Sequence, residues 1–274
     1  MIFAPIALGW KQVTPAGLVA MVATLVLFSA LSSLTYLVND VADVEADRRH
    51  PTKRRRPFAA GELSPAQGLA AAIVGAPLIL VLAWLIAPGV AATLAAYCAL
   101  TFAYSAGLKR APLVDCLAIA GLFTLRVVAG MAAGHFIWSP WFLTFAVTFF
   151  FSLALAKRHT ELIDGGSGAT GPVPGRGYRY EDRSLTLAFG AAASAAAIVI
   201  IILYLVDEVF PRGLWREPLW LWAAPPIIFL WIGRVWLLAN RGEMHDDPVV
   251  FALHDRTSWA MGAGVAATFL LAFI

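Results

Sequence analysis

Long apolar runs are the feature that most restricts the fold of this chain. Runs of about 18–25 apolar residues can cross a bilayer as α-helices. Such runs lie at roughly residues 16–38, 66–87, 90–107, 113–134, 140–157, 184–206, 218–238 and 256–274. With 60% apolar and 14% charged residues, the chain is far more apolar than a soluble domain. The sequence therefore predicts an all-α, polytopic membrane helix bundle.

The charges of the loops predict how these helices are oriented. Fifteen of the twenty Lys and Arg residues lie in every second loop, near 39–65, 105–112, 157–183 and 239–257. The loops on the other side hold only Lys11, Arg212 and Arg216. Because basic loops are retained in the cytoplasm, we expect the four basic loops to face the cytosol, with the protein in the cell membrane.

The first basic loop begins with an unusual group of acids. Asp40, Asp43 and Asp47 follow Asn39 within nine residues. On a helix, Asn39, Asp43 and Asp47 fall at i, i+4 and i+8, and Asp40 shares their broad face. Like charges stacked in this way repel one another, and a divalent cation removes that cost. Oxygen ligands without His favour Mg²⁺, which also bridges to substrate phosphates. The pattern predicts an Mg²⁺ site formed by these four residues, with the three aspartates catalytic; the plainer alternative is a solvated helix end.

A basic run follows the acids directly. Between residues 48 and 56 it contains five Arg and one Lys. Guanidinium groups match the geometry of phosphate oxygens. Lys53, Arg54 and Arg56 are therefore candidates for binding the phosphate of a water-soluble substrate.

The second cytosolic loop leads into a span that carries charge. Asp115 opens this span, and Arg126 lies three turns further along the same face. Ionisable residues inside a span usually face a cavity. Arg126 either pairs with Asp115 or binds the phosphate of a lipid, a role that Lys109 in the preceding loop also suits.

The third cytosolic segment supplies two more candidates. Lys157 and Arg158 are expected to bind phosphate, and Lys157 and Glu161 form an i, i+4 pair on an emerging helix. A loop rich in Gly and Pro follows, at residues 164–180. It is either a lid over the cytosolic mouth or a connector.

These motifs resemble those of a known family. The sequence N-D-x-x-D-x-x-x-D at a helix end, then H-P-x-K-R-x-R-P, is similar to the first Asp-rich motif of the UbiA superfamily of intramembrane transferases. The extended form resembles the decaprenyl-phosphate phosphoribosyltransferase branch. Y-S-x-G-L-K from Tyr104 to Lys109, K-R-x-x-E from Lys157 and G-E-x-x-x-D-P-V near the C-terminus match the same branch.

The resemblance carries several expectations. It implies one domain over residues 1–274, with about eight or nine spans around a central cavity open to the cytosol. Residues 1–9, containing Phe3-Ala4-Pro5, would end a truncated first helix. The implied reaction moves 5-phosphoribosyl from phosphoribosyl pyrophosphate to a polyprenyl phosphate, with Mg²⁺ neutralising the pyrophosphate that leaves. Tyr104, Asp115 and Asn39 join the substrate-binding candidates.

Two other functions stay open. An isoprenyl diphosphate:aromatic acceptor prenyltransferase would use the same first motif, although Ile119 stands where many superfamily members have a second acid. A transporter would show inverted repeats and polar breaks at mid-membrane, and we find none in the sequence. The basic loops also lack the interleaved aromatic residues of a nucleic-acid binder.

Overall fold

The computed structural model describes residues 1–49, 52–166, 168–244 and 247–274. Helices dominate this part, and it contains no β-strand. The long helices are α1 Pro15–Ala42, α4 Pro65–Ile86, α5 Pro88–Ala106, α6 Val114–Gly134, α7 Pro140–Asp164, α8 Arg183–Tyr204, α10 Ala224–Asn240 and α12 Arg256–Phe273. The expectation of an all-α polytopic bundle is confirmed.

Short elements connect the long helices. They are η1 Ala4–Leu8, η2 Trp10–Gln12, α2 Val44–Arg49, η3 Lys53–Arg55, α3 Pro57–Ala60, η4 Leu108–Arg110, η5 Tyr180–Asp182, the π-helical η6 Leu205–Val209, α9 Phe210–Arg212, η7 Pro218–Ala223 and α11 Pro248–His254. Residues 4–8 form the 3₁₀-helix η1, which packs against α6. That residues 1–9 end a longer helix stays a prediction.

Local sequence signals explain where several spans begin. Thr14 and Ser139 cap the N-termini of α1 and α7 through their side-chain oxygens. Ser64 and Gln67 form a reciprocal capping box at the start of α4. Proline occupies the first turn of each of these helices, where its missing N–H leaves no bond unmade.

Seven helical segments in the described part are long and apolar enough to cross a membrane. They include every expected span except the last. Helix α12 has 18 residues, a rise of about 27 Å against a hydrocarbon core of about 30 Å. It also begins with the polar residues Arg256, Thr257 and Ser258. The protein is an integral, multi-pass membrane protein.

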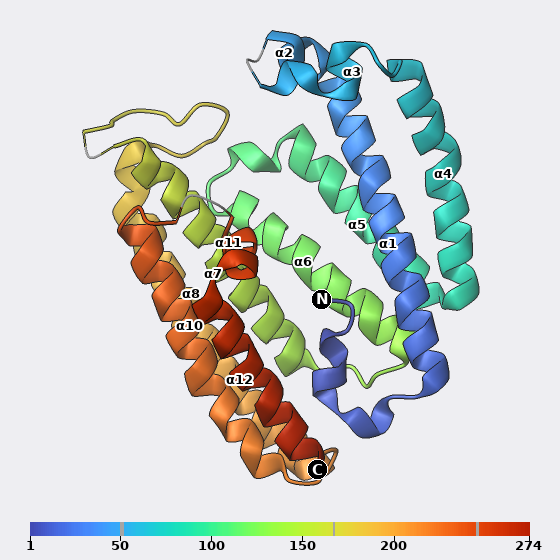
Figure 1. Cartoon of the computed structure of the whole chain (residues 1–274), viewed down its shortest axis with the longest axis vertical. Helices are drawn as coiled ribbons and strands as arrows, with labels where there is room; N and C mark the ends of the chain where they lie inside the picture. Colours follow the sequence, from blue (N-terminus) through green and yellow to red (C-terminus); the bar gives the residue numbers. More distant parts are fainter. Residues whose placement is uncertain (50–51, 167, 245–246) are drawn as a thin grey trace.

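The helices form two groups joined by a central pair. Helices α1, α4 and α5 pack together on one side, and α8, α10 and α12 lie on the other, with α6 and α7 between them (Figure 1). Between α7 and the second group, the Trp236 indole N–H of α10 donates to Ser152 Oγ of α7 at 2.9 Å, and Ser152 shares a 2.7 Å hydrogen bond with Ser194 of α8. Such buried polar contacts between closely packed helices are common in membrane bundles.

Candidate active site

The predicted site residues, with the exception of Arg126, gather at one end of the bundle. Helices α2, α3 and α11 and the loop between α7 and α8 all lie at this end, away from the C-terminus (Figure 1). The four basic loops of the sequence prediction lie at this end, and that it faces the cytosol stays a prediction. The polar side chains there form two clusters, one at the end of α1 and one where α6 begins and α7 ends.

The first cluster joins two of the predicted aspartates through one arginine. Arg56 Nη1 lies 2.9 Å from Asp40 Oδ1 and 2.9 Å from Asp47 Oδ2. The side chain of Asp47 is 5% exposed, whereas those of Asp40 and Arg56 are half-buried. Arg56, which was predicted to bind phosphate, therefore forms salt bridges with Asp40 and Asp47, which were predicted to bind the metal.

The acids do not share one uninterrupted helix as the spacing predicted. Helix α1 ends at Ala42, and Asp43 stands at the junction with α2. The backbone bonds from Asp43 N to Asn39 O and from Asp47 N to Asp43 O keep the chain close to helical there. Asn39 is half-buried and Asp43 is exposed. The break turns α2 aside from the axis of α1 (Figure 1).

The donor set suits Mg²⁺. In the described part, no group of three or more His, Cys, Asp or Glu side chains lies close enough to hold a metal. Mg²⁺ needs fewer protein ligands, because it keeps several waters and takes one or two carboxylates plus substrate phosphates. Asp40 Oδ1 and Asp47 Oδ2 are each 2.9 Å from Arg56 Nη1, which sets an upper limit on the distance between the two carboxylates.

Other residues of the basic run are less constrained. Arg54 is exposed and has no hydrogen-bond or ion-pair partner among the residues that the structure describes. The side chain of Lys53, and the motif residues His50 and Pro51, lie outside the described part. Lys109 is half-buried and is likewise unpaired within the described ranges.

The second cluster is built on a buried ion pair. Arg158 Nε lies 3.0 Å from Asp115 Oδ2, and the two side chains are 1% and 0% exposed. Of the two alternatives for Arg126, the pairing with Asp115 is therefore wrong, and the binding of a lipid phosphate stays a prediction. The sequence offered Arg126 because it lies on the same helix face, but the cation that reaches Asp115 comes from α7.

Arg126 lies deeper in the bundle. Eleven residues along α6 place it about 16 Å beyond Asp115. It donates to Leu122 O at 2.7 Å, and its guanidinium lies 5.1 Å from the ring centres of Phe28 and Tyr97. A hollow of about 320 Å³ adjoins Arg126, lined also by Met1, Ile2, Leu25, Phe28, Ser29 and Ser32. A central cavity that opens to the cytosol stays a prediction.

The loop between α7 and α8 is anchored to the second cluster. Tyr178 is 1% exposed, donates to Asp115 Oδ1 at 2.8 Å and accepts from Leu113 N at 2.7 Å. Burial raises the pKa of Tyr178 well above its usual range, so it stays a neutral donor. Arg176 of the same loop donates to Tyr104 Oη at 3.0 Å. Sequence reasoning did not identify Tyr178. The feature that could have indicated it is a large aromatic residue directly after Gly177. Any side chain at position 177 would collide with Arg110 O.

Lys157 and Glu161 do not pair with each other as expected. Lys157 Nζ lies 2.8 Å from Asp247 Oδ2. Glu161 forms ion pairs with Arg158 and Arg176 instead. Because long side chains at the end of a helix reach neighbouring loops, the local i, i+4 rule is overridden by tertiary partners.

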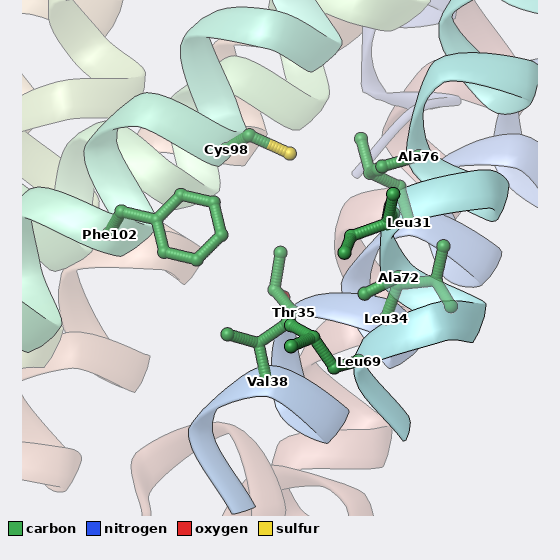
Figure 2. Close-up of a pocket in the computed structure, with 10 residues that line it drawn as sticks. Leu31, Leu34, Thr35, Val38, Leu69, Ala72, Ala76, Cys98 and Phe102 are labelled. Atoms are coloured by element: carbon green, nitrogen blue, oxygen red, sulfur yellow. The ribbon is translucent and has the colours of Figure 1, made fainter. Parts of the chain in front are cut away.

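An apolar crevice lies below the first cluster. It has a volume of about 250 Å³ and is bounded by α1, α4 and α5. Cys98 and Phe102 of α5 face Thr35 and Val38 of α1 and Ala76 of α4 across the hollow (Figure 2). Val38 immediately precedes Asn39, so the upper end of the crevice adjoins the Asp-rich cluster.

Comparison with known proteins points to one family. The profile of the UbiA prenyltransferase family matches residues 1–262. The Sinorhizobium fredii protein y4nM is 43% identical over 245 residues, which are 89% of this chain and 48% of that protein. The nodulation protein NoeC of Azorhizobium caulinodans is 31% identical over 240 residues, 87% of this chain and 78% of that protein.

A third similarity covers half of the chain. The decaprenyl-phosphate phosphoribosyltransferase of Mycobacterium tuberculosis is 39% identical over 137 residues, which are 50% of this chain and 45% of that enzyme. This chain thus spans about half the length of y4nM and of the mycobacterial enzyme.

Proposed function

The chain belongs to the UbiA prenyltransferase family, and we propose that it transfers 5-phosphoribosyl from phosphoribosyl pyrophosphate to a polyprenyl phosphate. The proposal is supported by the mycobacterial relative, whose name states that activity. The structural observation that carries it is the cluster of Asp40, Arg56 and Asp47, where carboxylates and a phosphate-binding cation meet at the end of a span.

The bond changes assign roles to the residues at this end. The bond between ribose C1 and the pyrophosphate oxygen breaks, and a bond forms between C1 and an oxygen of the lipid phosphate. The lipid phosphate is already an anion, so no general base is required. Asp40 and Asp47 would hold Mg²⁺ in the arrangement that the structure shows, and Asp43 and Asn39 would complete the predicted set of ligands if they move closer; the ion would supply charge neutralisation for the pyrophosphate. Lys53, Arg54 and Arg56 would bind the ribose 5-phosphate.

The lipid would approach from within the membrane. We place part of its isoprenoid chain in the apolar crevice between α1, α4 and α5, with the phosphate at the upper end near Asn39. Lys109 is the cation that we assign to this phosphate, because Arg126 lies about 16 Å below the start of α6.

The buried pair has a different part in this proposal. Arg158 and Asp115 are closed off from solvent, so they hold α6 and α7 in place and Arg158 does not touch the substrate in this conformation. Lys157 is half-exposed beside Asp247 and remains a candidate for the donor phosphates. Tyr104 would act through Arg176, from which it accepts a hydrogen bond.

A transfer assay tests the proposed reaction. Membranes containing the chain are incubated with Mg²⁺, labelled phosphoribosyl pyrophosphate and a polyprenyl phosphate. We expect label in the lipid extract, no label with EDTA, and at least tenfold less label with Asp43→Ala. Wild-type activity and Mg²⁺ dependence in Asp43→Ala would contradict the metal site.

The same preparation separates the second candidate. An aromatic prenyltransferase is favoured by the name of the family, and it would act on an isoprenyl diphosphate and an aromatic acid. Prenylated product without any phosphoribosyl lipid would replace the proposed reaction with this one.

A further inference from the structure

One nitrogen atom of Arg56 occupies the place between two carboxylates. Its Nη1 is 2.9 Å from an oxygen of Asp40 and 2.9 Å from an oxygen of Asp47. Asp40 belongs to α1 and Asp47 to α2, and Arg56 directly precedes α3, so the contact joins three separate helices. The guanidinium supplies the positive charge that the stacked acids need.

A guanidinium and a divalent cation cannot both remain there. Arginine keeps its charge at every physiological pH, and like charges at contact distance repel. Mg²⁺ bound to Asp40 and Asp47 would therefore expel Arg56 from its present position. The side chain of Arg56 is 41% exposed, so it is free to swing away from the carboxylates.

From these contacts we infer that Arg56 is an exchangeable counter-ion of the metal site, which moves to a donor phosphate when Mg²⁺ takes the two aspartates. The inference rests on the proposed function and deepens it. Before substrate arrives, Arg56 neutralises Asp40 and Asp47. Afterwards the same guanidinium offers its paired N–H groups to phosphate oxygens, which match its fork geometry.

This exchange couples two binding events. Metal binding releases Arg56 for the phosphate, and phosphate binding removes Arg56 from the metal ligands. Each ligand must then increase the affinity for the other by the same factor. A purely structural salt bridge would leave only the coupling that arises where a donor phosphate ligates the metal, because Arg56 would stay on the aspartates throughout.

The test measures metal affinity directly. The purified full chain is titrated with Mn²⁺, followed by electron paramagnetic resonance, with and without phosphoribosyl pyrophosphate. The variant is Arg56→Gln. The matched control is Arg48→Gln, which removes the same charge from α2 and, among the described residues, breaks only the exposed contact with Glu45.

We expect opposite effects in the two conditions. Without the donor, Arg56→Gln should bind Mn²⁺ roughly tenfold more tightly than the wild type, since its competitor is gone. With the donor, the wild type should gain about tenfold more in metal affinity than Arg56→Gln does, because donor phosphates ligate the metal in both but only the wild type also releases Arg56. Arg48→Gln should resemble the wild type throughout. Equal or weaker Mn²⁺ binding by donor-free Arg56→Gln would overturn the counter-ion role.

A second measurement needs no variant. Phenylglyoxal modifies accessible guanidinium groups, and mass spectrometry reports each site separately. Labelling of Arg56 should rise on adding Mg²⁺ and fall again with the donor, while labelling of Arg48 stays constant. No rise with Mg²⁺ would overturn the exchange. A rise with Mg²⁺ that the donor leaves unchanged would support the counter-ion role and count against phosphoribosyl pyrophosphate as the substrate.

Discussion

Arg158 on α7 and Asp115 at the start of α6 form an ion pair that is almost completely buried, with Nε and Oδ2 3.0 Å apart. Charges at this depth are stable only while they are paired. Tyr178 donates to the other oxygen of Asp115, so the loop after α7 is tied to the same pair. The pair thus joins the start of α6, the end of α7 and the loop that follows α7.

Removing one partner of this pair should destabilise the protein strongly. Arg158→Met leaves the Asp115 carboxylate buried without its cation, at a cost of about 3–5 kcal/mol. The measurement is thermal unfolding in detergent, monitored by size-exclusion chromatography. Arg48→Met is the control, because its pair with Glu45 is exposed and contributes less than about 1 kcal/mol. Equal losses in both variants would contradict the importance of burial.

Removing one hydroxyl should loosen the loop. Tyr178→Phe deletes the donor to Asp115 and leaves Leu113 N without its acceptor, which costs about 1–3 kcal/mol. Trypsin cleavage after the exposed Arg179 should therefore become roughly tenfold faster, because the loop opens more often. Tyr180→Phe should cleave like the wild type, since its hydroxyl has no partner in the described part. Unchanged cleavage of Tyr178→Phe would show that the ring alone anchors the loop.

The sequence predicted the helices far better than the pairing of charges. Apolar runs and N-terminal caps depend on neighbouring residues, so Ser64 and Ser139 mark helix starts without any tertiary information. The partner of Asp115 could not be found in this way. Arg126 shares its helix face, but Arg158 reaches it from another helix, and only the packing of α6 against α7 decides between them. The same holds for Lys157, whose partner Asp247 is ninety positions away.

The Asp-rich motif shows both outcomes at once. Its spacing correctly predicted that Asp40 and Asp47 lie near each other. The break at Asp43 and the contact of Arg56 with both aspartates depend instead on how the short helices α2, η3 and α3 fold back over α1. The spacing of residues in the sequence does not predict that the chain folds back in this way.

Low pH should weaken the junction between α11 and α12. Burial disfavours the charged form of Asp255, but hydrogen bonds from Ser258 and the pairing with Arg234 outweigh it and hold the pKa below its usual range. The resulting stability is present above the ordinary carboxyl pKa of about 3.9 and is lost as the pH falls through the lowered folded-state pKa. Unfolding measured from pH 6 to pH 3 should show this loss in the wild type. Asp255→Asn should lack this component, and identical pH profiles would argue against it.

Filling the crevice tests where the isoprenoid chain lies. Ala76 faces the hollow across from Cys98 (Figure 2), and Ala76→Phe would occupy part of its volume of about 250 Å³. Each methylene group that loses its apolar contact costs about 0.8 kcal/mol. The KM for a long-chain polyprenyl phosphate should therefore rise by roughly tenfold or more, whereas the KM for an acceptor too short to enter the crevice should not change.

A matched substitution separates this effect from damage to the fold. Val74 lies on the same helix, is 68% exposed and does not line the crevice, so Val74→Phe should leave both KM values as in the wild type. Thermal unfolding of the two variants checks that both are folded. If Ala76→Phe raised the KM of long and short acceptors equally, the chain would lie elsewhere, because a blocked tail site can only affect lipids that reach it.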